Sequence, residues 1–180
     1  MDRWGPAYVE AARERLAQAR RDYPWTKGMV NMPALPSNEV SYKTILVSNP
    51  GAGLDWSQVV PVGTGGAGKW WLLYAVYAQL VQGATQTPQP LLQFDDGTGL
   101  WMESTGSTTA QAASTTVAYS WAPNMLLTGL IGSGANVHAN APIPDSLVFP
   151  AGYHIKTSTV GIGANSQWQN IRLMVAELGN

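Results

Sequence analysis

The first stretch with a clear hydrophobic pattern, residues 6–23, has the period of an α-helix. Pro6 suits the first helical turn, where its missing N–H costs nothing, and Pro24 ends the helix. The apolar side of this helix is formed by Tyr8, Ala12, Leu16, Ala19 and Tyr23. Because this stripe is narrow and includes two alanines, we expect the helix to dock on the body of the protein or on a partner.

Residues 24–39 combine prolines with isolated large apolar side chains. The prolines are Pro24, Pro33 and Pro36, and the apolar residues between them are Trp25, Met29, Val30, Met32 and Leu35. A solvated linker would be rich in Gly and Ser or in charge. The composition therefore predicts an extended arm that lies along a surface. We expect residues 1–39 to form a helix and arm, and residues 40–180 to form a separate β-domain.

From Val40 onward, short apolar runs alternate with turn residues, which is typical of β-strands. The pattern predicts strands near 40–48, 56–62, 69–82, 90–95, 99–105, 114–121, 126–131, 146–149, 153–160 and 168–178. The turn signals are Asn49-Pro50-Gly51, Asp96-Gly97, Gly132-Ser133-Gly134 and Ala151-Gly152. Many short strands without helices between them predict an all-β domain, a jelly-roll-like antiparallel β-sandwich.

Two patterns of burial are expected among these strands. Alternation places Val117, Tyr119 and Trp121 on one face, and likewise Ile171, Leu173 and Val175. The run Trp70–Ala78 is apolar on both faces, so we expect it to be covered on both sides, by the arm or by another subunit. The candidate interface residues are Tyr8, Leu16, Tyr23, Trp25, Met29, Met32, Trp70, Trp71, Tyr74 and Tyr77.

The charge content narrows the possible partners. Only 12% of the residues are charged, against about 25% in an average domain, and the net charge is −1. No global field attracts nucleic acid or membrane, and the arginines of the helix are interleaved with acidic residues. The eight Trp favour a surface that is covered in an oligomer, although a neutral polar surface of Ser, Thr, Gln and Asn is the alternative. The apolar run Trp70–Ala78 is too short to span a membrane, and we expect a soluble protein made in the cytoplasm.

No motif predicts catalysis, a metal or another cofactor. Gly63–Lys69 has the spacing of a P-loop, but Trp70 stands where Ser or Thr is needed and a strand is predicted where a helix is needed. The Asp95–Gly99 segment lacks calcium-loop spacing and reads as a hairpin turn. The sequence also has no cysteine, which excludes disulfides and thiolate metal sites.

Two further kinds of site are weakly indicated. A triad of Asp145, Ser146 and His154 is disfavoured because neighbouring strand residues point to opposite faces. Trp101, Trp121 and Trp168 are candidates for a carbohydrate platform, although core packing is the commoner use of Trp in strands. We therefore expect a protein that is not an enzyme.

Several segments resemble small structural proteins encoded in the morphogenesis modules of tailed bacteriophages. They are Trp56–Gly63, Trp70–Val76, Leu92–Gly97, Leu147–Ile155 and Gln167–Leu173. These include the family's W-x-x-x-V-P-x-G strand and its late L-P-A-G-Y-x-I hairpin, with Phe149 in place of the leucine. The resemblance covers residues 40–178 and not the N-terminal arm.

The resemblance implies a virion component, assembled in the host cytoplasm, with a jelly-roll-like sandwich and no catalytic residues. It implies a capsid decoration, or cement, protein that stabilises the phage head as a homotrimer. Its partners would be itself and the major capsid protein or another virion protein. The alternative is a tail, collar or fibre module that binds host carbohydrate.

Overall fold

The computed structural model describes residues 40–62, 68–83, 86–133 and 137–178 of the chain. These residues form ten strands and no helix. The strands are β1 (Val40–Leu46), β2 (Ser57–Val59), β3 (Trp70–Val81), β4 (Gln89–Asp95), β5 (Leu100–Thr105), β6 (Thr116–Pro123), β7 (Val137–Ile143), β8 (Leu147–Phe149), β9 (His154–Val160) and β10 (Gln167–Leu178). The predicted all-β architecture is confirmed, whereas the predicted helix 6–23 and arm 24–39 lie outside the described residues.

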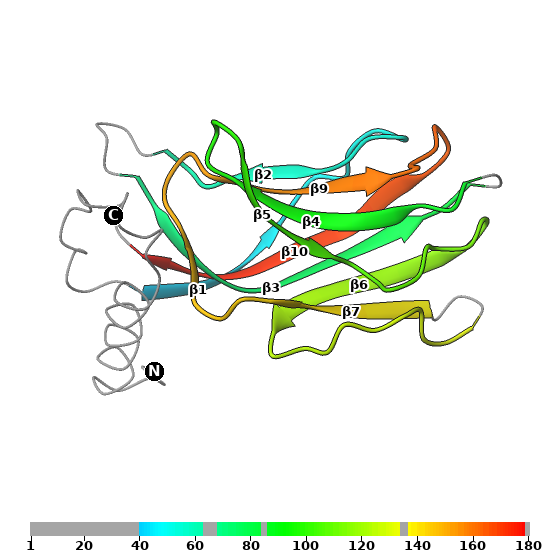
Figure 1. Ribbon diagram of the computed structural model, residues 1–180. Helices are drawn as coiled ribbons and strands as arrows, with labels where there is room; N and C mark the ends of the chain where they lie inside the picture. The colour runs from blue at the N-terminus through cyan, green and yellow to red at the C-terminus, as the bar shows by residue number, and fades with distance from the viewer. Residues whose placement is uncertain (1–39, 63–67, 84–85, 134–136, 179–180) are drawn as a thin grey trace.

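The strands form two sheets that face each other as a sandwich (Figure 1). The larger sheet has the order β1-β10-β3-β6-β7, with β8 pairing β3, and the smaller sheet has the order β2-β9-β4-β5. All neighbouring strands are antiparallel except β6 and β7, which run parallel. At one side the edge strands of the two sheets meet, where the Ser104 hydroxyl donates to the carbonyl of Pro142 at 2.7 Å.

The core lies between the sheets and is built from alternating residues of nearly every strand. The largest fully buried side chains are Trp56, Trp71, Trp121, Trp168, Tyr119, Phe94, Phe149, Leu73, Leu80, Leu92, Ile155 and Ile171. The two alternating sets predicted from sequence, on β6 and on β10, are all buried here. Four tryptophans therefore serve the core, the commoner use of large aromatics in a sandwich.

Strand β3 changes phase along its length. Trp71 and Leu73 face the core near its start, but Val76, Ala78 and Leu80 do so further on. The pairing with β10 shifts at Met174/Val175, which marks a bulge at this point. The side chains on the other side of β3, among them Trp70, Leu72 and Tyr77, are half-buried. Strand β3 is thus buried on its inner side and half-buried on its outer side, and the predicted cover of the outer side by the arm or another subunit stays a prediction.

Two predicted elements differ from the structure. Residues 126–131 were expected to be a strand, but they form an irregular segment with one isolated bridge, between Ile131 and His138. The strand in this region is β7, which the sequence analysis missed. Two of its three buried positions, Ala139 and Ala141, are small, so its alternation is weak.

Candidate functional site

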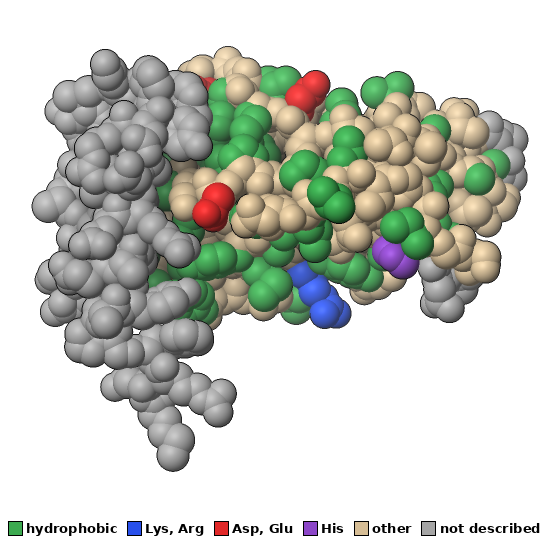
Figure 2. Space-filling view, turned by 60° about the horizontal axis from the view of Figure 1, so that its bottom comes forward, with side chains coloured by type: hydrophobic (Ala, Val, Ile, Leu, Met, Phe, Trp, Pro, Cys, Tyr) green, Lys and Arg blue, Asp and Glu red, His purple; other side chains and the backbone are tan. Residues whose placement is uncertain are grey.

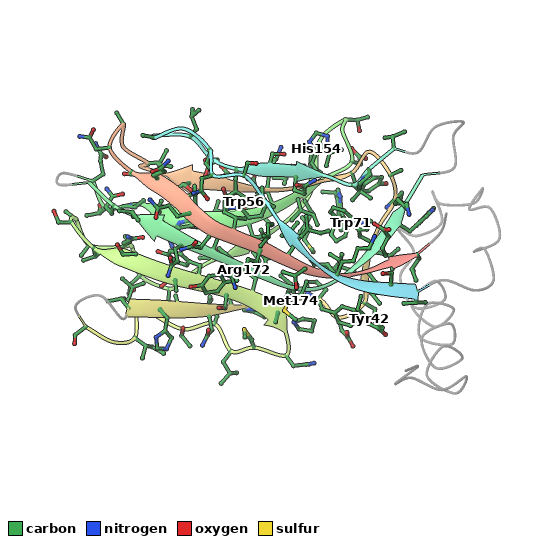
Figure 3. All side chains as sticks on the ribbon, turned by 180° about the vertical axis from the view of Figure 1, so that it is seen from behind. Tyr42, Trp56, Trp71, His154, Arg172 and Met174 are labelled. Carbon is green, nitrogen blue, oxygen red and sulfur yellow. The ribbon has the colours of Figure 1, made fainter. Side chains whose placement is uncertain are left out.

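A group of outward-facing residues on β1, β10 and β3 forms the first candidate contact surface, here called the outer apolar face. It consists of Tyr42, Leu46, Tyr77, Arg172 and Met174. Because Leu173 and Val175 of β10 are buried, Arg172 and Met174 must point away from the core. Figure 3 shows Tyr42, Met174 and Arg172 in a row along the side where β1 and β10 lie in front.

The strand register brings these residues together. Leu46 of β1 lies opposite Arg172 of β10, which in turn lies opposite Tyr77 of β3. Leu46 is 73% exposed and Met174 is 54% exposed, values that are high for large apolar side chains. The ring of Tyr42 lies 5.8 Å from that of Tyr74, which adds aromatic area beside the patch. Tyr, Met and Arg on one apolar patch are the residues enriched at protein interfaces.

Residues 124–131, here called the Leu126 loop, form a second exposed apolar surface. Leu126 is 82% exposed, and Leu127 and Ile131 are 43% and 45% exposed. Figure 2, turned to bring the β7 side forward, shows mainly apolar and neutral side chains with only isolated charges.

The Leu126 loop is held in place by its backbone. The Thr128 amide donates to the carbonyl of Asn140 at 2.9 Å, and the Asn140 amide donates to the Thr128 hydroxyl at 2.9 Å. Ile131 and His138 exchange two backbone hydrogen bonds of 2.8 and 2.9 Å. The loop therefore presents its apolar side chains from a fixed backbone, which lowers the entropic cost of a contact.

The buried carboxylate of Glu177 is the centre of a partly exposed ionic group at the end of the larger sheet. Its carboxylate accepts hydrogen bonds from Lys43 at 2.6 Å, from Lys69 at 2.9 Å and from the indole of Trp71 at 3.3 Å. Burial opposes ionisation, but these donors favour the charged form more strongly, and the pKa of Glu177 falls to about 2. The group joins β1, β3 and β10.

The same contacts bear on the P-loop-like segment. Lys69, the lysine of that pattern, is paired with Glu177, and the residues after it form strand β3. A phosphate-binding loop needs that lysine for its ligand and a helix after it. Lys69 and the strand after it therefore do not have the arrangement of a phosphate-binding loop.

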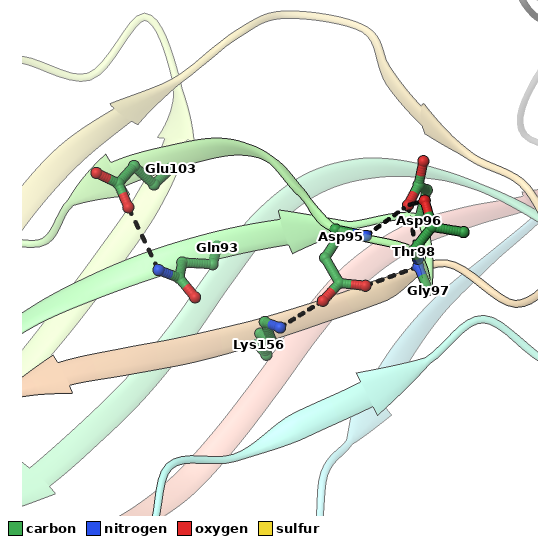
Figure 4. A network of polar contacts seen from close by, with 8 residues as sticks. Gln93, Asp95, Asp96, Gly97, Thr98, Glu103 and Lys156 are labelled. Atoms are coloured by element: carbon green, nitrogen blue, oxygen red, sulfur yellow. Dashed lines mark hydrogen bonds and ion pairs between the residues drawn. The ribbon is translucent and has the colours of Figure 1, made fainter.

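The Asp95–Gly99 segment forms the turn between β4 and β5 (Figure 4). The Asp95 carboxylate pairs with Lys156 and accepts the Gly97 amide at 2.7 Å, and these contacts lower its pKa. The Asp96 carboxylate accepts the Thr98 hydroxyl and amide, which lower its pKa. Gly97 has φ +85°, as the predicted turn requires. Within the described ranges no group of three potential metal ligands occurs.

The other candidate residues fall in different places. Trp71 is 1% exposed, so this interface candidate belongs to the core, because β3 turns it inward. Trp70, Tyr74 and Tyr77 are half-buried on the outward side of β3. The remaining interface candidates, Tyr8, Leu16, Tyr23, Trp25, Met29 and Met32, lie outside the described residues.

The carbohydrate platform and the triad are not assembled. Trp121 and Trp168 are fully buried, whereas Trp101 is 37% exposed and packs against Phe94 and Phe149 with ring centroids 5.9 Å apart. No hydrogen bond joins Asp145, Ser146 and His154 in the part of the chain that is described. No helix there is long and apolar enough to cross a membrane.

Sequence reasoning missed three exposed apolar residues of these two surfaces, Leu46, Leu126 and Met174. The exposure of Met174 could have been predicted from the alternation of β10, since this residue lies between two inward-facing positions. The exposure of Leu126 could not, because an apolar run of that kind is typical of a buried strand.

Comparisons with known proteins identify no family. No family model and no curated protein match the chain. Among solved structures, a chain described as "Structure of infectious bursal disease virus Gx strain" aligns with 10% identity and a TM-score of 0.24, over 83% of this chain and 44% of that one. This chain thus spans less than half of the length of that protein, and a TM-score this low carries no argument about function.

Proposed function

We propose that this chain is a structural protein of a tailed-phage virion, a capsid decoration protein that stabilises the head by adding contacts between its subunits. The observation that carries the proposal is the pair of exposed apolar surfaces, the outer apolar face and the Leu126 loop, on a sandwich with few free charges. Surfaces of this kind mark sites of protein contact. The assignment to a phage virion rests on the family resemblance of residues 40–178.

The order of the strands supports a jelly roll. When β7 and β8 are treated as an insertion between β6 and β9, eight strands remain. We number these eight strands from one to eight along the chain. The larger sheet then has the order one-eight-three-six, and the smaller sheet has the order two-seven-four-five. All of their pairings are antiparallel. This is the arrangement of two Greek keys in a jelly roll, an architecture used in viral capsids and also in lectins, so the function must come from the surface.

The rival function, a tail or fibre module that binds host glycan, has less support. It requires aromatic side chains that present a face to a sugar. Trp121 and Trp168 are fully buried and are therefore occupied in the core. Of the three candidates only Trp101, near the Asp95–Gly99 turn, is exposed, and it offers a single aromatic side chain to a sugar.

Location in the particle tests the proposal. Particles made by the genome that encodes this chain should contain it on the head, as detected by mass spectrometry and by electron microscopy with a labelled antibody. The purified chain should also co-sediment with heads that lack it. A chain found only on tails or fibres, and that binds purified host polysaccharide, would support the rival function instead.

A further inference from the structure

Most charged side chains of the described residues are already held by local partners. Glu177 and Asp95 are paired with lysines. The Asp55 carboxylate accepts the amide of Thr159 at 2.8 Å and the indole of Trp168 at 3.1 Å. Because these charged groups already have partners within the molecule, they are poor candidates for contacts with another molecule.

Two exposed charged residues, Arg172 and Asp145, are different. The side chains of Arg172 and Asp145 make no hydrogen bond or ion pair with any other residue that the structure describes, and they have opposite signs. Arg172 lies in the outer apolar face, between Leu46 and Tyr77 in the strand register. An arginine surrounded by exposed apolar side chains is the usual composition of an interface hot spot.

Asp145 lies near the other exposed apolar surface. Strands β6 and β7 run parallel, and Pro123 at the end of β6 is aligned with Ile143 at the end of β7 (Figure 1). The chain continues from the same end of both strands, into the Leu126 loop after Pro123 and into Asp145 two residues after Ile143. The topology thus places a free carboxylate beside one apolar surface and a free guanidinium within the other.

These two charges do not pair with each other in the structure. Arg172 lies on β10, whereas Asp145 lies between β7 and β8, and β8 pairs with β3, so β3 separates the backbones of the two residues.

We propose that copies of this chain associate so that the outer apolar face of one copy packs on the Leu126 loop of another and Arg172 pairs with Asp145 of that neighbour. This rests on the proposed function, whose oligomeric contacts it specifies. A contact of the outer apolar face with itself would bring two Arg172 cations together without a carboxylate. Contact between the two different surfaces gives each cation an anion, either reciprocally in a two-fold dimer or head to tail in a ring.

A charge exchange tests the contact in the full-length chain. We expect R172E and D145K each to weaken self-association at least about tenfold, measured by light scattering and sedimentation velocity across a concentration series. The double variant R172E/D145K restores the pair with its charges exchanged, and should recover the assembled mass. E103K, which alters an exposed carboxylate of the smaller sheet, is the matched control and should assemble like the parent.

The outcomes are separable. A monomeric parent chain, single variants that assemble normally, or a double variant no better than the single ones would each overturn the proposal. Association that is lost on removal of residues 1–38 and unaffected by R172E and D145K would assign the contact to the N-terminal segment instead. Assemblies that form in solution through this contact, from a chain absent from virions, would overturn the proposed function and leave this contact standing.

Discussion

At the scale of single residues, Glu177 shows how a buried charge joins the larger sheet. Its carboxylate is reached by lysines from β1 and from the residue before β3. Removing the carboxylate costs stability because both lysines, which are only partly shielded from water, lose their counter-charge. No sequence pattern indicated this group, since Lys43, Lys69 and Glu177 are far apart along the chain.

The variant E177Q should lower the free energy of unfolding at pH 7 by about 1–3 kcal/mol, because it leaves two lysines without their carboxylate. The pKa of Glu177 is lowered from 4.5 to about 2 in the folded protein. Its stabilisation is therefore complete above pH 4.5 and is lost as the pH falls towards 2. Urea unfolding as a function of pH measures both effects. The parent should lose stability in that window, whereas E177Q should lose less. The control E103Q, at an exposed site, should follow the parent.

A glycine beside the core offers a second test at this scale. A Cβ added at Gly106 would lie 2.9 Å from the ring of Trp121 and 3.1 Å from the carbonyl of Pro90. These groups are fixed by packing, so the variant G106A should cost about 1–3 kcal/mol in thermal or urea unfolding. At Gly99 an added Cβ meets nothing within 4 Å, and G99A should change stability by less than about 0.5 kcal/mol. Equal stability of the two variants would contradict the close approach.

At the scale of elements, the strands with strong alternation were predictable and the others were not. Strands β6 and β10 carry large residues on their inward side, so pattern alone identified their buried faces. Strand β7 places alanines there, and the apolar Leu126 loop looks more like a strand than β7 does. The loop became visible only through its exposed side chains. A sequence pattern shows only where hydrophobic residues lie. Because contact surfaces and cores are both hydrophobic, the pattern does not distinguish them.

In the irregular segment between β5 and β6, the buried side chain of Gln111 makes three hydrogen bonds. Its amide nitrogen donates to the carbonyls of Leu80 and Thr115, both at 2.9 Å, and its oxygen accepts the Tyr119 hydroxyl at 3.1 Å. Burial raises the pKa of Tyr119, so this phenol stays a donor at any ordinary pH.

The variant Q111A should therefore cost about 2–4 kcal/mol, because the Leu80 carbonyl and the Tyr119 hydroxyl each lose a buried hydrogen bond and the Thr115 carbonyl keeps the Gln82 amide. Y119F removes only one of these bonds and should cost about 0.5–1.5 kcal/mol. Chemical denaturation gives both values, and hydrogen exchange of residues 107–115 should rise more in Q111A. A larger loss in Y119F than in Q111A would show that the tyrosine, not the glutamine, organises the segment.

At the scale of the whole molecule, the core formed by the described residues lies within the predicted β-domain. Its buried cluster is drawn from residues between Trp56 and Val175. The division of the chain at residue 39 stays a prediction from sequence, as does the partner of the arm.

Deletion of residues 1–38 should leave a folded sandwich, with a β-type circular dichroism spectrum and cooperative thermal unfolding, because no residue of the described core is removed. We expect the truncated protein to self-associate but to lose binding to phage heads in co-sedimentation. An unfolded product would show that the segment completes the core. Retained binding to heads would place the head contact on the sandwich itself.

The pairing of β1 with β10 has a practical consequence. Val40 lies opposite Leu178, so the first and last strands of the sandwich begin and end at neighbouring positions. Paired residues of this kind have Cα atoms about 5 Å apart, a gap that a short peptide can bridge. The sandwich can therefore be circularly permuted, with new termini opened at a solvent-exposed turn such as Gly97–Gly99. A permuted chain would carry a fused cargo at that turn and keep both sheets intact.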